Sequence, residues 1–445
     1  MSSRAREAGR STAHHAPFPG PATTPGPADP PAGSSGPTPA ALPLLPLAAL
    51  FTVGYLPAYL VPTIATRLSD ALGLTDTQAG GVGSALLLAS AAAGIALAGR
   101  VGRLGSARLA RAGLALVTLG FALAAGSGGT PPLLVAGCVL GGLGAGAASA
   151  VAGTGLAGTA DPHRASVLGL LATSLAAAGL YLLLPHLGGS PAGPFLALAA
   201  LGPLVLPLTS ALPGPLPCAP TAAGRLPNRS AGLLLAATTV LWAVVQNALW
   251  GVSGQIGLHR VGFSERGLGL VFAVALGGGL VGVLASGVLG SRVGRVLPLG
   301  LGTAAIAGCV ALSAAARSAA GFAGGEVLWN ALYPLVLTYL LGLAAELDPA
   351  GRWTVLVGAA SALGVAGGPL AGATMLVDLG CPLFAVVLGG ALLFTAVPLV
   401  LLARTFCGRP PGEVPVDLAI ALPIPVPRAA ELCESDPTAA TATAA

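Results

Sequence analysis

The sequence predicts an all-α integral membrane protein with twelve transmembrane helices in two pseudo-symmetric six-helix bundles. Only 8% of the 445 residues are charged, too few to cover a water-soluble protein of this length. Apolar runs of about 20 residues recur along the chain, which is the length that crosses a bilayer as a helix. These runs are continuous rather than alternating, so a transmembrane β-barrel is disfavoured. Their length, repeated along the chain, also disfavours a large soluble helical fold.

Two short loops each occur twice, which is the third observation behind this fold class. The first reads Gly155-Leu-Ala-Gly-Thr-Ala-Asp161-Pro162-His-Arg164 and returns as Gly342-Leu-Ala-Ala-Glu-Leu-Asp348-Pro349-Ala-Gly-Arg352. The second reads Gly102-Arg103-Leu-Gly105 and returns as Ser291-Arg292-Val-Gly294. The offsets all lie between 187 and 189 residues. Two loops duplicated at one period predict two homologous halves.

The elements follow in the order that two such halves require. A Pro-rich tail at 1–40 and a second tail at 405–445 are predicted to be disordered. Between them lie an N-terminal bundle at 41–212, a linker at 213–231 and a C-terminal bundle at 232–404. The Gly- and Ala-rich fourth helix is assigned because the repeat pairs it with the tenth. The predicted helices are 42–65, 78–98, 108–125, 131–153, 165–187, 192–212, 232–255, 268–290, 297–315, 320–343, 353–376 and 382–404.

The arginines predict the orientation of the chain. All 20 basic residues are arginine, and an even number of helices places both tails on one side. Near the helix ends, twelve arginines lie on the side of the tails and four on the other side, namely Arg67, Arg260, Arg266 and Arg317. The excess predicts that the tails and the duplicated loops are cytoplasmic, in a multi-pass protein of the cell membrane. Scattered basic residues predict no nucleic-acid partner.

Cysteine and histidine usage argues against two other classes of protein. The six cysteines have neither paired nor metal-ligand spacing, so no disulfide framework and no metal site are expected. A multispanning enzyme would need clustered His, Asp or Glu near one membrane face, and the five histidines are dispersed. A receptor would need a folded signalling module, which neither tail offers. We therefore expect no enzyme and no cofactor.

Six plus six helices, a cytoplasmic linker and the duplicated loops resemble the major facilitator superfamily of secondary transporters across residues 42–404. The family has the motif Gly-x-Leu-Ala-Asp-Arg-x-Gly-Arg-Arg after its second helix. The match is better in the second half, at Gly287, Leu289, Gly290, Arg292, Gly294 and Arg295. Ser291 and, in the first half, Gly102 stand where the family has an acid. The entry to the second helix, with Thr75 or Thr77 as cap, also resembles the family.

The resemblance assigns the duplicated loops to the gate of a transporter. In the family, the acid of the motif joins a cytoplasmic charge network that stabilises one state, so its absence implies a gate that differs in detail. The gate residues implied on the cytoplasmic loops are Arg103, Gly105, Arg164, Arg292, Gly294 and Arg352. The family's antiporter motif is absent from the fifth helix, but Gly364-x-x-x-Gly368-Pro369-x-x-Gly372 occurs in the eleventh. Close helix packing with a proline kink is favoured there over a coupling role.

In this family the first, fourth, seventh and tenth helices line a central cavity. Helical spacing places polar and aromatic residues on one face of three of these helices, and such faces should converge because polar groups face lipid at a high cost. The fourth helix, mostly Gly and Ala, should leave room. The expected substrate-binding residues are Tyr55, Tyr59, Trp242, Gln246, Trp250, Trp329, Asn330 and Tyr333, together with Thr52, Thr63, Thr239 and Ser253 on the same faces. Helix packing or an interfacial belt is the alternative for each aromatic residue.

Glu326 is the one ionisable residue that the predicted segments place inside the membrane. It is a candidate proton carrier or counter-ion for a cationic substrate, unless the tenth helix starts later and leaves it among the headgroups. With no basic residue in the predicted helices except near their ends, the cavity suits a neutral or cationic, partly apolar organic molecule. The resemblance implies alternating access by a functional monomer, with proton-coupled efflux preferred. Uptake of a small polar metabolite and passive facilitation remain open.

Overall fold

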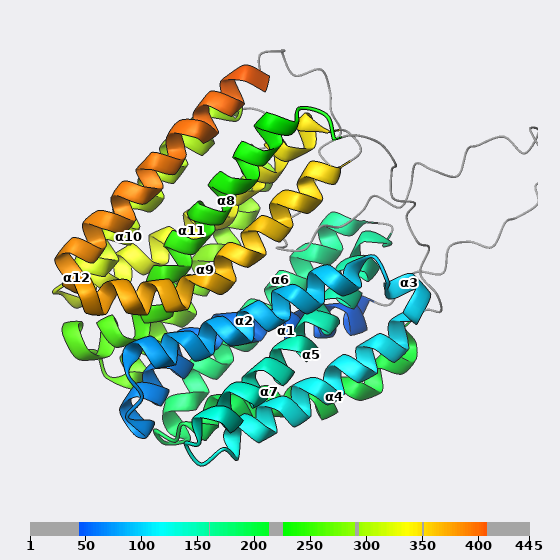
Figure 1. Cartoon of the computed structure of the whole chain (residues 1–445), viewed down its shortest axis with the longest axis vertical. Coiled ribbons are helices and arrows are strands. Elements are labelled where there is room, and N and C mark those ends of the chain that lie inside the picture. The colour runs from blue at the N-terminus through cyan, green and yellow to red at the C-terminus, as the bar shows by residue number, and fades with distance from the viewer. Residues whose placement is uncertain (1–43, 160, 213–225, 290–292, 349–350, 407–445) are drawn as a thin grey trace, which may run out of the picture. The chain divides into compact units, whose positions relative to one another are not determined.

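The computed structural model describes residues 44–159, 161–212, 226–289, 293–348 and 351–406, and this part of the chain is helical without β-strands (Figure 1). The first half contains α1 (Leu44–Leu72), α2 (Asp76–Ala98), the short α3 (Val101–Leu104), α4 (Ser106–Ala125), α5 (Pro131–Ala157), α6 (Pro162–Leu183) and α7 (Ala192–Val205). The second contains α8 (Arg229–Gln255), α9 (Glu265–Leu289), α10 (Thr303–Ala315), α11 (Ala319–Leu347) and α12 (Arg352–Phe406). Short 3₁₀ or π turns extend several of them: η1 (Leu184–His186), η2 (Leu206–Ala211), η3 (Ile256–Val261) and η5 (Pro298–Gly302).

Eleven helices of the described residues are long and apolar enough to cross a membrane, and the last of them contains two crossings. At 55 residues, α12 would be about 80 Å long if straight, far more than the ~30 Å of hydrocarbon. Gly380 interrupts it with φ 67° and ψ 161°, a conformation open essentially to glycine alone. Figure 1 shows the chain reversing direction between the two arms of α12. The twelve-helix prediction is therefore confirmed.

Capping residues explain where several helices begin. Thr75 accepts a hydrogen bond from the Gln78 amide while the Gln78 side chain accepts one from the Thr75 amide, so α2 starts with a complete capping box. Asp161 caps α6 through the Arg164 amide, and Ser318 caps α11 through the Gly321 amide. These contacts satisfy backbone donors that a helix start would otherwise leave free.

The structure corrects one boundary with a consequence for function. The first helix was expected to end at residue 65, where the apolar run stops, but α1 continues to Leu72. The added turns place Arg67 inside the helix with only 6% of its surface exposed. Arg67 is therefore a buried ionisable residue of a candidate membrane-spanning helix, in addition to Glu326.

The small residues of α5 serve close helix packing rather than leaving space, contrary to expectation. A Cβ atom at Gly142 would lie 2.3 Å from the Leu86 carbonyl of α2, and one at Gly146 would lie 2.2 Å from the Ser90 carbonyl. On the α4 side, a Cβ at Gly144 would lie 2.5 Å from the Val117 amide nitrogen. The backbone of α5 thus lies directly against two neighbouring helices.

Helices of the two halves meet mainly where α1 contacts α8, where α2 contacts α12 and where α6 contacts α9. We call the end of the helices where α1 finishes and α2 starts the Arg67 end, and the opposite end the Arg295 end. The Leu370 amide, which follows Pro369 in α12, donates to Ser84 Oγ of α2 at 3.0 Å. A Cβ at Gly269 of α9 would lie 2.3 Å from the Tyr181 carbonyl of α6. The halves are therefore in backbone-level contact toward the Arg67 end.

Candidate functional site

The polar faces of α8 and α11 converge as the helical spacing predicted. The Trp329 indole donates to Gln246 Oε1 at 2.9 Å, and the Ser253 hydroxyl donates to Glu326 Oε1 at 2.7 Å. The Gln246 amide in turn donates to a carbonyl of its own helix. All four side chains are buried. Two direct links thus join the helices along the face that was expected to line a cavity.

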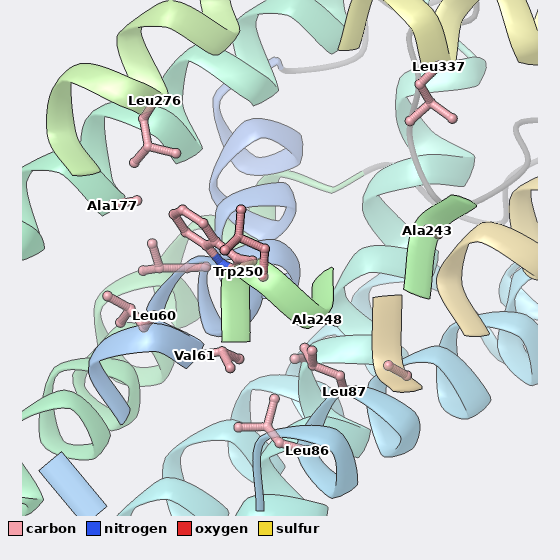
Figure 2. Close-up of a cluster of buried hydrophobic side chains, with 14 of the residues drawn as sticks. Leu60, Val61, Leu86, Leu87, Ala177, Ala243, Ala248, Trp250, Leu276 and Leu337 are labelled. Atoms are coloured by element: carbon pink, nitrogen blue, oxygen red, sulfur yellow. The ribbon is translucent and has the colours of Figure 1, made fainter. Parts of the chain in front are cut away.

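Aromatic rings surround these polar links. Trp242 of α8 stacks on Tyr333 of α11 with ring centroids 5.1 Å apart, and Trp250 meets Trp329 edge-on at 5.9 Å. The Trp250 indole donates to the Ala58 carbonyl of α1 at 3.2 Å, which ties this cluster to the other half. Figure 2 shows Trp250 among buried apolar side chains from both halves, including Leu60. Trp250 is therefore a contact between the halves as well as a member of the predicted face.

The tyrosines of α1 approach the same region. Tyr59 lies within electrostatic range of Tyr55, of Tyr181 on α6 and of Tyr333 on α11. The Tyr181 hydroxyl donates to the Tyr59 carbonyl, and the Tyr55 ring lies 4.4 Å from that of Phe51. The Tyr55 hydroxyl is buried without a hydrogen-bond partner. The faces of α1, α8 and α11 therefore converge.

Glu326 is the most unusual group in this cluster. Its side chain has no exposed surface, and α11 starts at Ala319, so Glu326 lies two turns inside the helix rather than before it. Oε1 accepts the bond from Ser253, whereas Oε2 is buried with no partner. No ion pair to Glu326 occurs among the described residues, and Tyr181 lies within electrostatic range of it. Burial without a cationic partner disfavours the charged carboxylate. Asn330, also predicted for this site, donates to the Glu326 carbonyl of its own helix.

A second polar cluster, which sequence reasoning missed, joins the halves at the Arg67 end. The Arg67 guanidinium donates to the carbonyls of Leu184 and Ser190 and forms an ion pair with Glu265 at 3.0 Å. Glu265 belongs to α9, so this pair crosses between halves. Helical spacing could have placed Arg67 on the face of Tyr55, Tyr59 and Thr63, but it gives no indication of the partners of Arg67.

Two more contacts beside Arg67 also cross between the halves. His259 Nε2 lies 3.1 Å from Asp70 Oδ1, and the Gln255 amide donates to Asp76 Oδ1 at 2.7 Å. A pocket enters between the halves here, with Arg67 and Glu265 in its wall and Thr63 and Tyr181 among its other lining residues. Gly254, next to the Ser253 partner of Glu326, also lines it. The pocket therefore lies between the halves at the Arg67 end, with Tyr181 and Gly254 in its wall.

The predicted gate residues lie at the Arg295 end. Arg103 and Arg164 are exposed, while Gly105 and Gly294 have φ angles of 87° and 64°, which explains the glycine in both copies of that loop. Arg352 pairs with Asp348 of its own loop at 2.7 Å. Arg292 lies outside the described residues.

The duplicated motifs of the second half contact each other. Arg295 donates to the Gly342 carbonyl at 2.6 Å and pairs with Glu346 at 2.7 Å, so the loop after α9 is held to the end of α11. At the matching positions of the first half the chain has Ser106 and Thr159, which cannot form an ion pair. The two halves therefore share a fold but differ in this connection.

The glycine motif of α12 packs against α8, as the favoured interpretation predicted. Cβ atoms at Gly364, Gly368 and Gly372 would lie 2.6, 2.3 and 2.0 Å from atoms of α8. The motif therefore has a full structural explanation in helix packing. Among the described residues no group of three His, Cys, Asp or Glu side chains could hold a metal ion.

The sequence matches no protein-family model and no curated protein. Solved structures do match. A D-xylose-proton symporter is 15% identical with a TM-score of 0.65, over 80% of this chain and 96% of the other. A bacterial homolog of the human lysosomal transporter Spinster, inward-facing and unoccupied, is 16% identical with a TM-score of 0.62, over 83% and 98%. A POT family transporter in complex with a thioalcohol-conjugated peptide is 13% identical with a TM-score of 0.64, over 81% and 96%. The chain therefore has the fold of the major facilitator superfamily.

Proposed function

We propose that this protein is a secondary transporter that moves a small organic molecule across a membrane by alternating access. The observation that carries the proposal is the cluster around Glu326, where a buried carboxyl group with an unpartnered oxygen adjoins aromatic and amide side chains between two halves of a transporter fold. Ionisable groups buried in membrane helices are costly and are retained mainly for function.

The chemistry of the cluster favours a neutral or cationic, partly apolar substrate. Trp242, Trp250, Trp329 and Tyr333 offer aromatic faces, which attract cations and apolar groups alike. Glu326 is the acid of this cluster, and no basic side chain takes part in the described contacts within it. An anionic substrate would lack a cationic partner there.

Glu326 is also the proposed proton carrier. Its neutral form suits the buried site, and deprotonation creates a charge that a cationic substrate would neutralise, so proton and substrate compete for one carboxyl group. The pocket beside Arg67 and Tyr181 would give protons a route to it while the polar contacts hold that end of the halves together. Competition of this kind drives efflux of substrate against entry of protons.

The test is gradient-driven transport in proteoliposomes with ethidium as a fluorescent lipophilic cation. We expect wild-type protein to accumulate ethidium on the acidic side of an imposed pH gradient, and Glu326→Gln to abolish that accumulation. Glu346→Gln is the matched control, because its carboxyl group lies at the Arg295 end in an ion pair with Arg295. Unchanged gradient-driven flux in Glu326→Gln would refute Glu326 as the proton carrier.

Uptake or passive facilitation of a small polar metabolite is the alternative. It draws support from the hydrogen-bonding groups of Gln246, Asn330 and Tyr55 and from the sugar–proton symporter among the similar structures. Wild-type protein that equilibrates a labelled neutral metabolite, ignores ethidium and is indifferent to the pH gradient would favour facilitation. Accumulation of the metabolite together with protons would favour uptake.

We propose that the Arg295 end faces the cytoplasm of a cell-membrane protein, because the arginine excess lies there. Cys381, beside the Gly380 bend, would then face outward, and Cys407 inward. An impermeant thiol reagent added to intact cells should label Cys381 and spare Cys407. The reverse pattern would overturn the orientation and leave the fold untouched.

A further inference from the structure

A pocket at the Arg295 end of the second half is separate from the Glu326 cluster. It lies between the segment that leads into η5 and the last turns of α12, and its volume is about 930 Å³ with its open side included. Its walls include Arg295, Leu297, Gly300, Leu301, Val400 and Arg404. Its two walls are close together at Gly300, where a Cβ atom would lie 3.0 Å from a Val400 methyl group.

The pocket changes from charged to apolar along the direction of the helices. Arg404 follows Val400 by one turn on the same face of α12 and is nearer the end of that helix at Phe406. On the other wall, Arg295 precedes the helical residues, whereas Leu301 lies further into the membrane span. Both arginines are thus at the membrane surface, and the apolar residues lie deeper. A phospholipid has the same order of a charged headgroup followed by apolar chains.

Of the two charges of the pocket, that of Arg404 is not neutralised within the described part of the protein, whereas Arg295 is paired with Glu346. Arg404 is exposed and forms no hydrogen bond or ion pair with any described residue. Arg295 is fixed by Glu346 and the Gly342 carbonyl, which holds its guanidinium group at the rim. Two guanidinium groups at the end of a membrane span suit a phosphate group, to which arginine binds with several donors at once.

The apolar wall faces outward rather than into the protein. Leu297 is 52% exposed and Leu301 is 64% exposed, although both lie in or beside a membrane-spanning segment. Exposed leucines at this depth contact lipid chains, so an apolar occupant reaches the pocket from the bilayer itself. A small free anion, in contrast, would gain no favourable contact with these apolar side chains.

We propose that this pocket binds one anionic phospholipid, with its phosphate between Arg404 and Arg295 and an acyl chain along Leu301, Gly300 and Val400. The lipid comes from the membrane leaflet at the Arg295 end. It would brace the loop after α9 against the last turn of α12, at the place where Arg295 also holds α11. The site is independent of what the protein transports.

Native mass spectrometry of the detergent-purified protein tests this proposal, with phosphatidylglycerol and phosphatidylcholine of identical acyl chains as probes. We expect wild-type protein to retain one phosphatidylglycerol in preference to phosphatidylcholine. Arg404→Gln should lower phosphatidylglycerol retention about fivefold, the effect of one arginine near an anionic surface. Arg108→Gln is the matched control, because Arg108 is also exposed but lies on α4, outside the pocket. Its retention should equal that of wild type.

A second variant tests the apolar part of the site. Gly300→Leu fills the pocket beside Val400 and leaves Arg404 unchanged. It should reduce retention of phosphatidylglycerol, because the acyl chain loses its place along the apolar wall. Thermal unfolding without added lipid checks that the variant is folded. Equal retention of the two lipids by wild type, or equal losses in Arg404→Gln and Arg108→Gln, would overturn the proposal. Displacement of the lipid by millimolar inorganic phosphate alone would also count against it, since it would make the apolar wall irrelevant.

Discussion

The ion pair between Arg67 and Glu265 is expected to hold the two halves together at the Arg67 end. The substitution that tests this is Glu265→Gln, which keeps the shape of the side chain and removes its charge. Arg67 has 7% of its side chain exposed and Glu265 has 44%, so the pair is neither fully buried nor a free surface pair. Arg67 keeps its bonds to the carbonyls of Leu184 and Ser190 in the variant, so the first half should stay folded.

The size of the effect follows from this partial exposure. Exposed ion pairs contribute up to about 1 kcal/mol, and solvent around Glu265 holds the value near that limit rather than at the several kcal/mol of a buried pair. A change of about 1 kcal/mol corresponds to roughly fivefold in an equilibrium constant. Glu265→Gln should therefore raise the population of protein open at the Arg67 end about fivefold.

Thiol labelling measures that population. In a variant without other cysteines, a single cysteine replaces Thr66, which is 3% exposed and borders the pocket beside Arg67. We expect its labelling rate to rise about fivefold in Glu265→Gln and the difference to shrink at high salt. The same rate should be unchanged in Glu346→Gln, whose ion pair joins elements within one half. Equal rates with and without the Glu265 charge would refute a role for this pair in holding the halves together.

Two further predictions concern packing and hydrogen bonding between helices. Gly372→Ala should lower the free energy of unfolding by about 1–3 kcal/mol, because the added methyl group would lie 2.0 Å from the Ala248 carbonyl. The control is Gly367→Ala, whose methyl group would have its nearest neighbour at 3.7 Å. This variant should unfold at nearly the wild-type temperature. If Gly372→Ala instead kept full stability and lost only proton-driven flux, the motif would be a coupling element. Gln246→Leu should cost about 1–3 kcal/mol because it leaves the buried Trp329 indole without an acceptor, while Gln246→Glu retains one; equal melting temperatures for the two variants would contradict this reasoning.

The helices and the convergence of three of them could be predicted from the sequence, because membrane spans are set by local composition. A run of apolar residues long enough to cross the bilayer is stable there as a helix and in few other conformations. A polar face on such a helix avoids the lipid and therefore faces other helices. The positions of Glu326, Trp329 and Gln246 followed from helical spacing alone. Their pairing across α8 and α11 required only that the faces meet.

The Arg67 cluster could not be predicted in the same way. Hydropathy falls after residue 65, yet the backbone of α1 continues because the Arg67 guanidinium finds two carbonyls and a carboxylate from distant parts of the chain. The residues next to Arg67 in sequence give no sign of these acceptors, which are more than 100 positions away. The small residues of α5 were ambiguous for a similar reason, since glycine is equally compatible with an open cavity and with a close helix contact. Only the position of the facing backbone decides between them.

The bend at Gly380 bears on how the chain enters the membrane during synthesis. The two arms of α12 are separated by one non-helical residue, and Asp378 and Cys381 are the polar residues nearest the turn. No hydrophilic segment is long enough there to hold the first arm in place while the second is still being made. We therefore expect the last two crossings to enter the bilayer together as one helical hairpin.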